Sequence, residues 1–126
     1  KERSGTRSRE MLVRSALSLG AAHEAVADAK GAKAAYAHGL ARVPEDPELL
    51  IASGALAHRT GRVEDAIIFF EDALRHGGPE AQMRNNLAAL HMQQGRPDRA
   101  LPHVERLVAM SPGDARLRYT LGVLYA

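Results

Sequence analysis

Apolar residues recur along the chain with the spacing of amphipathic helices. In residues 47–60 and again in residues 63–76, apolar or small side chains return at intervals of three and four positions, as one face of a helix requires. Gly61 separates the two stretches and suits the end of a helix. No stretch of useful length alternates with a period of two, so the pattern predicts an all-α fold made of helical hairpins.

Polar residues mark where these helices begin. Asp46 directly precedes Pro47, and this pair predicts an N-cap followed by proline in the first helical turn. Asp98, which follows Pro97, and Asp114, which follows Pro112 and Gly113, give similar signals at the next two boundaries. Each predicted helix has roughly 14 residues and a length of about 20 Å.

The pattern repeats every 34 residues. Small residues, alanines, bulky residues and chain breakers each keep their own position in the period, which indicates a stack of similar units. One hairpin alone could not bury its apolar face, so we expect a small residue to meet a bulky one wherever stacked helices cross. The four columns are Gly20, Gly54, Ala88 and Gly122; Ala32, Ala66 and Ala100; Tyr36, Phe70 and Val104; and Pro44, Gly78 and Pro112. The predicted units are residues 13–46, 47–80 and 81–114, followed by a half-unit at 115–126.

This arrangement resembles the tetratricopeptide repeat (TPR) family from about residue 12 onward. The family's unit has a Leu-Gly pair in its first helix, an alanine and an aromatic residue in its second helix, and a proline at its end. The resemblance implies an α-α superhelix, a right-handed solenoid of stacked antiparallel hairpins. The matching residues are Leu19, Gly20, Ala32, Tyr36 and Pro44; Gly54, Ala66 and Phe70; Leu87, Ala88, Ala100 and Pro112; and Leu121, Gly122 and Tyr125.

Two departures from the family pattern affect packing. The first unit has no glycine corresponding to Gly61 and Gly95, so the end of its first helix is not marked. Histidine replaces the family's first-helix tyrosine at His23 and His91. At these two positions we expect partly buried imidazoles that are held by hydrogen bonds.

The core of this protein must consist mainly of small residues. Hydrophobic residues make up 45% of the 126, but only 4% are aromatic and tryptophan is absent. Helices rich in alanine can approach one another closely, which fits a stack of hairpins. The chain has no cysteine, and this excludes disulfides and thiolate metal sites.

The net charge of +2 is concentrated at the N-terminus, where residues 1–10 hold four basic and two acidic side chains. Residues 1–11 are predicted to form a basic flexible arm, and residues 12–126 the repeat domain. Because the repeat domain is neutral, we expect no binding to nucleic acid. The sequence favours a cytoplasmic location, and a membrane tether would have to lie in a segment outside this chain.

No constellation of residues in the sequence suggests catalysis. His23 and Glu24 begin like a zinc-protease helix, but Ala27 stands where the second histidine is required. Gly77 and Gly78 belong to a turn between helices and not to a phosphate-binding loop. We therefore expect no enzymatic activity within this chain, no metal and no cofactor.

By the geometry of the TPR family, the first helix of each unit lines a concave groove. The resemblance implies a scaffold that binds a peptide or a helix of another protein in this groove. It also suggests a part of a larger assembly protein, such as bacterial envelope, secretion or polysaccharide machinery. The expected groove residues are Arg14, Leu17, Ala21, Ile51, Ala55, His58, Gln82, Asn85, Ala89, Met92, Arg116 and Tyr119.

Two other functions remain open at this point. Leu117, Leu121 and Val123 give the last segment, residues 115–126, an apolar helix face that could support self-association. Alternatively, the repeats could regulate an enzyme whose catalytic part lies outside this chain.

Overall fold

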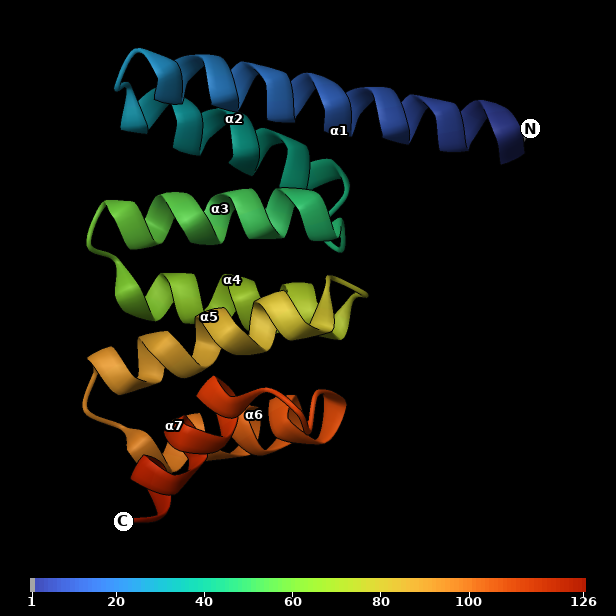
Figure 1. Ribbon diagram of the computed structural model, residues 1–126. Helices are drawn as coiled ribbons and strands as arrows, with labels where there is room; N and C mark the ends of the chain where they lie inside the picture. The colour runs from blue at the N-terminus through green and yellow to red at the C-terminus, as the bar shows by residue number, and fades with distance from the viewer. Residues whose placement is uncertain (1) are drawn as a thin grey trace. The chain divides into compact units, whose positions relative to one another are not determined.

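The computed structural model describes the backbone of residues 2–126 and the side chains of residues 5–126. Over these residues all the regular structure is α-helical, as predicted (Figure 1). The helices fall into two compact units, unit 1 (Lys1–Gly78) and unit 2 (Pro79–Ala126). Unit 1 contains α1 (Glu2–Ala25), α2 (Ala29–Arg42), α3 (Pro47–Arg59) and α4 (Val63–Arg75). Unit 2 contains α5 (Glu80–Gln93), α6 (Pro97–Met110) and α7 (Ala115–Tyr125).

Aspartates cap three of the helices, two of them at predicted positions. The signal at Asp98 is wrong as a cap, because Asp98 lies in the first turn of α6, whose N-cap Arg96 makes no side-chain cap hydrogen bond. The Asp46 carboxylate accepts a hydrogen bond of 2.9 Å from the Leu49 backbone N–H, and the Asp114 carboxylate accepts one of 3.0 Å from the Arg116 backbone N–H. Asp28 caps α2 in the same way. Each cap satisfies a helix-end donor and contributes about 1 kcal/mol.

The turn that joins the two helices of a hairpin uses a left-handed residue in each repeat. Gly61 has φ +79° and Gly95 has φ +70°. Ala27, which precedes Gly61 by 34 positions, takes the same conformation with φ +58° and is the one non-glycine residue with positive φ within the described backbone. The unmarked end of the first helix therefore has the same turn as the others, although an alanine must adopt it.

The predicted flexible arm is wrong for residues 2–11, which form the first turns of α1. The stretch contains no proline, and its arginines, glutamates and methionine are good helix formers. An ion pair of 3.0 Å between Arg9 Nη2 and Glu45 Oε1 fixes it to the loop before α3. The segment has no apolar periodicity because residues 5–11 are all exposed, so the hydrophobic pattern could not reveal the helix.

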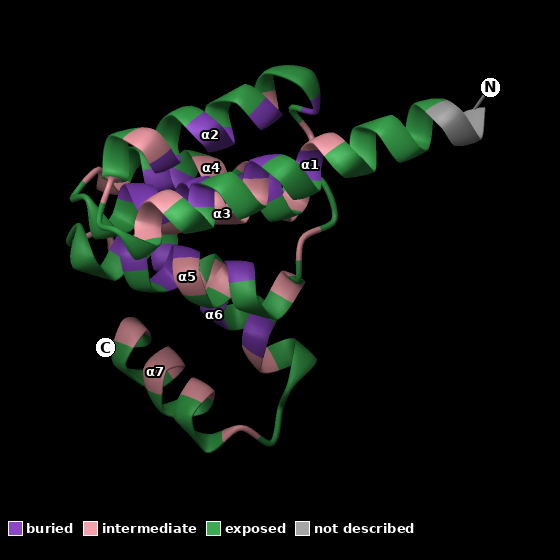
Figure 2. Cartoon of the chain, turned by 90° about the horizontal axis from the view of Figure 1, so that it is seen from above, coloured by how far each residue is buried: buried purple, intermediate pink, exposed green. Residues whose placement is uncertain are grey.

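Small residues meet bulky residues at the helix crossings of unit 1, as the repeat predicts. A Cβ built on Gly20 would overlap the ring of Tyr36, and one built on Gly54 would lie 2.7 Å from Cε1 of Phe70. Both rings are buried, with 3% and 4% of their surface exposed. Buried residues gather on the sides where the helices of this unit pack (Figure 2).

Unit 2 repeats this packing once. Ala88, Ala100 and Val104 form its buried cluster, and Leu121 and Leu124 of α7 pack against that cluster half-buried. Gly122, the fourth member of the small-residue column, has no atom within 4 Å of its would-be Cβ. α7 itself contains no buried residue.

Candidate functional site

The α1/α3 face is a strip of unit 1 where two helices run parallel and are joined at both ends by ion pairs. At one end Arg14 Nη1 lies 3.8 Å from Glu48 Oε2. At the other end Glu24 of α1 pairs with Arg59 of α3, and it also accepts a hydrogen bond from the hydroxyl of Tyr36. In each pair the two partners are about one repeat apart in sequence. The pairs therefore hold the first helices of neighbouring repeats in register.

The expected groove residues of unit 1 lie on this face. Leu17, Ile51 and Ala55 are half-buried, so part of their apolar surface remains accessible. Arg14, Ala21 and His58 are exposed. The residues beside them on α3, such as Leu50 and Ala57, are buried. The middle of the face, at Ala21 and Ala55, therefore carries only methyl groups.

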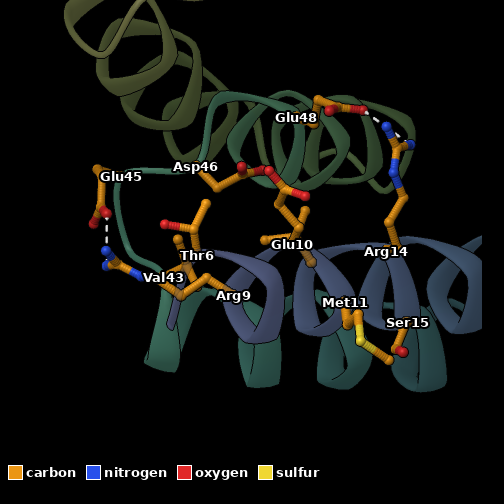
Figure 3. Close-up of a pocket in the computed structure, with 11 residues that line it drawn as sticks. Thr6, Arg9, Glu10, Met11, Arg14, Ser15, Val43, Glu45, Asp46 and Glu48 are labelled. Carbon is orange, nitrogen blue, oxygen red and sulfur yellow. Dashed lines mark hydrogen bonds and ion pairs between the residues drawn. The ribbon is translucent and has the colours of Figure 1, made fainter. Parts of the chain in front are cut away.

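A pocket of about 760 Å³ opens at the end of this face where α1 and α3 begin (Figure 3). Arg9 and Arg14 reach across it to Glu45 and Glu48, as the dashed lines in Figure 3 show. Acidic side chains outnumber basic ones on its wall, because Glu10 and Asp46 also line it. Arg14 is the one residue of the pocket among the expected groove residues. The other pocket residues of α1 are not among them, because the sequence predicts a flexible arm at the start of this helix.

The α5/α7 face belongs to unit 2 and carries the other expected groove residues. Asn85 and Arg116 line a shared pocket of about 370 Å³ together with Asp114, Leu117 and Thr120. The Arg116 side chain is 94% exposed, and its Nε lies 3.8 Å from Asp114, so its guanidinium is accessible to a ligand. The remaining expected residues are exposed on the same two helices: Gln82, Ala89, Met92 and Tyr119.

A polar cluster joins α5 to α6 away from the expected groove residues. Glu80 accepts hydrogen bonds from Arg84 Nε at 2.9 Å and from Arg106 Nε at 3.1 Å, and these two bonds hold its pKa below the usual value. Arg84 Nη1 also lies 3.2 Å from Nδ1 of His103. The His103 ring stacks on His91 with centroids 6.1 Å apart. Burial first, and then the charges of Arg84 and His91, lower the pKa of His103.

The two histidines that replace the family's tyrosine differ in how far they meet the prediction. His23 is half-buried, and its Nδ1 lies 2.9 Å from the Asp28 carboxylate, as expected. A hydrogen bond from the Gly31 backbone N–H holds the pKa of Asp28 below its usual value. The contact with His23 lowers this pKa further. His91 is buried, but its Nδ1 has no hydrogen-bond partner within the described residues, contrary to the expectation.

No group of three histidine, cysteine, aspartate or glutamate side chains in residues 5–126 could hold a metal ion. No helix in the described part of the chain is long and apolar enough to cross a bilayer.

Comparison with known proteins identifies the family. Tetratricopeptide repeat models match residues 10–83 and residues 81–124. No curated protein sequence matches the chain. Among solved structures, MamA is similar with a TM-score of 0.77 at 22% identity, over 90% of this chain and 62% of the MamA chain. The chain thus spans about three fifths of that relative.

Two further structures show the same fold. YrrB, described as a TPR protein with an unusual peptide-binding site, has a TM-score of 0.69 at 22% identity over 83% of this chain and 54% of its own. The second TPR domain of human RPAP3, solved with an HSP70 peptide, has a TM-score of 0.75 at 15% identity over 94% of this chain and 98% of its own. The family models cover more than half of the sequence, and the chain belongs to the tetratricopeptide repeat family.

Proposed function

We propose that this chain is an interaction scaffold that binds a peptide or a helix of another protein on the first helices of its repeats. The observation that carries the proposal is the α1/α3 face, where ion pairs fix two parallel helices and only Ala21 and Ala55 occupy the middle. A face without large side chains leaves room for a partner segment, and the half-buried Leu17 and Ile51 offer it apolar contact.

The α5/α7 face supplies polar groups for the same task. Gln82 and Asn85 can donate to and accept from a peptide backbone, and Arg116 can pair with a carboxylate. Met92 and Tyr119 are 41% and 75% exposed and add adaptable apolar contact. The human RPAP3 domain of the same fold was solved with a bound peptide, which supports this role.

The proposed role of this chain within a larger protein is therefore binding and not catalysis. Such a scaffold fits an assembly protein of the bacterial envelope, of secretion or of polysaccharide machinery. This part of the proposal follows from the family and from no single residue.

Self-association through α7 is the second candidate function. Tyr119, Val123 and Tyr125 of this helix are 75%, 51% and 62% exposed, which is unusual for large apolar side chains. A second copy of the chain that packs against them would remove this surface from water.

A peptide selection tests the first candidate. Peptides that bind the wild-type chain would be selected from a random library displayed on phage, and their affinities would then be measured for variants. Ala21→Arg and Ala89→Arg place a long charged side chain on the two faces, and we expect each to weaken the peptides of its face at least about tenfold. Ala109→Arg, at an exposed position of α6, is the matched control and should bind as the wild type does.

Sedimentation velocity on the same variants separates the two candidates. If the faces bind partners, Ala21→Arg and Ala89→Arg lose peptide without any change in sedimentation. If α7 drives self-association, Val123→Glu lowers the sedimentation coefficient while peptide binding persists. Equal peptide affinities for all three arginine variants would refute binding on these faces.

A further inference from the structure

A second, separate slot lies in unit 1 between α2 and α4, with α3 as its floor. Its volume is about 290 Å³, near the lower end of the range for small-ligand sites. None of the expected groove residues lines it, because it opens among the second helices of the hairpins and not on the α1/α3 face.

The walls of the slot are apolar, and small residues create its space. Ala37 and Ala41 stand one turn apart on α2 and are both exposed, so at these two positions no long side chain fills the gap toward α4. Leu40 and Leu56 contribute further apolar surface, and Phe69 closes the side formed by α4. A ligand would therefore bury hydrocarbon along most of the slot.

One end of the slot is cationic. Lys33 on α2 and Arg62 before α4 both line it there. Arg62 is positioned by Asp65 at 3.1 Å and by the Thr60 hydroxyl at 3.3 Å. Lys33 makes no ion pair with any described residue, so its ammonium is available to an anion. From Lys33 to Ala41 the helix rises about 12 Å, which sets the length of the slot from its charged end to its apolar end.

The floor holds a hydroxyl without a partner. Ser53 of α3 lines the slot and is only 6% exposed. Within residues 5–126 its side chain makes no hydrogen bond. The hydroxyl can therefore hydrogen-bond with an oxygen atom of a ligand in the slot.

We propose that this slot binds a medium-chain aliphatic carboxylate. The carboxylate lies beside Lys33 and Arg62, and the chain runs along Ala37 and Ala41. Because one end of the slot is cationic, the head group should be an anion. Because the walls are apolar, the tail should be a hydrocarbon chain. This ligand site is independent of the peptide-binding role, since the two use different faces of unit 1.

Calorimetric titration with octanoate tests the proposal, and octylammonium and octanol serve as probes with the same tail. We expect saturable binding of one octanoate per chain, weaker binding of octanol and no binding of octylammonium. Lys33→Gln should weaken octanoate about three- to fivefold, as loss of one exposed ion pair does. Ala37→Leu should fill the slot and reduce affinity at least about tenfold.

Ala34→Leu is the matched control, because Ala34 stands on the same helix but lines a different cavity between α1 and α2. It should bind octanoate as the wild type does. The proposal is overturned if octanoate fails to bind saturably, if octylammonium or octanol binds equally well, or if the two leucine variants behave alike. Lys33→Gln changes an exposed residue and keeps the test decisive should Ala37→Leu not fold. Ala21→Arg should leave octanoate binding unchanged, whether or not the peptide proposal holds.

Discussion

At Gly20 and Gly54 it is the absent side chain that matters. The ring of Tyr36 occupies the place where a Cβ on Gly20 would stand. That ring cannot easily move away, because it is buried and its hydroxyl donates a hydrogen bond to Glu24. Gly122 keeps the same position in the repeat but faces open space. A side chain at each of these three glycines should therefore change the free energy of unfolding by a different amount, although the glycines look equivalent in the sequence.

Substitution by alanine should separate these positions. We expect Gly20→Ala to lower the free energy of unfolding by about 1–3 kcal/mol, because the new methyl group overpacks the contact with Tyr36. Gly122→Ala should raise helix stability by up to ~1 kcal/mol, since alanine is the better helix former and nothing obstructs it. Urea unfolding followed by circular dichroism measures both. Equal losses for the two variants would contradict the small-against-bulky packing.

At the scale of elements, the turn after α1 stores strain that the other hairpin turns avoid. Ala27 has φ +58°, a region in which an alanine Cβ is crowded. Ala27→Gly should therefore raise the free energy of unfolding by about 1 kcal/mol, and Gly61→Ala, the matched reverse change, should lower it by a similar amount. Thermal unfolding of the two variants measures the difference. A destabilised Ala27→Gly would show that the entropy of glycine in the unfolded chain outweighs the relief of strain.

The elements were largely predictable from sequence, and the failures have physical causes. Helix faces and the caps at Asp46 and Asp114 follow from local chemistry, so residue types reveal them. The start of α1 could not be found by periodicity, because a fully exposed helix has no apolar face. The left-handed turn at Ala27 was hidden because alanine does not signal it, although the 34-residue interval from Gly61 does.

The helix face that carries the expected groove residues of unit 1 could be assigned from the sequence, but the contacts on that face could not. Periodicity and the family resemblance indicated which turns of α1 and α3 share a face. They could not show that Arg14 pairs with Glu48, because partner choice among exposed charges depends on side-chain positions. The slot between α2 and α4 was missed altogether, since it depends on small residues at Ala37 and Ala41 that look ordinary in an alanine-rich chain.

For the whole molecule, the two units should respond differently to acid. Burial, Arg84 and His91 hold the pKa of His103 in unit 2 below its usual value of 6.5. Glu80 and Arg106 complete the charges of that cluster. The unfolded chain binds a proton at His103 more readily than the folded chain does. The contribution of His103 to stability is therefore complete above about pH 6.5 and is lost as the pH falls below that value.

Amide hydrogen exchange between pH 5 and pH 8 tests this dependence. We expect protection of α5 and α6 to fall on the acid side after correction for the intrinsic exchange rate. His103→Gln should flatten the dependence while it keeps an acceptor for Arg84. If the variant and the wild type lose protection in parallel, another group must control the acid sensitivity of unit 2.

The small-against-bulky contacts also bear on how the chain folds as it is synthesised. Gly20 meets Tyr36, and Gly54 meets Phe70, across only sixteen positions of sequence. Contacts of such short range close quickly and need little chain to be present. Each hairpin of unit 1 thus has its defining partners soon after its second helix leaves the ribosome, so folding can follow translation hairpin by hairpin, without waiting for the C-terminus.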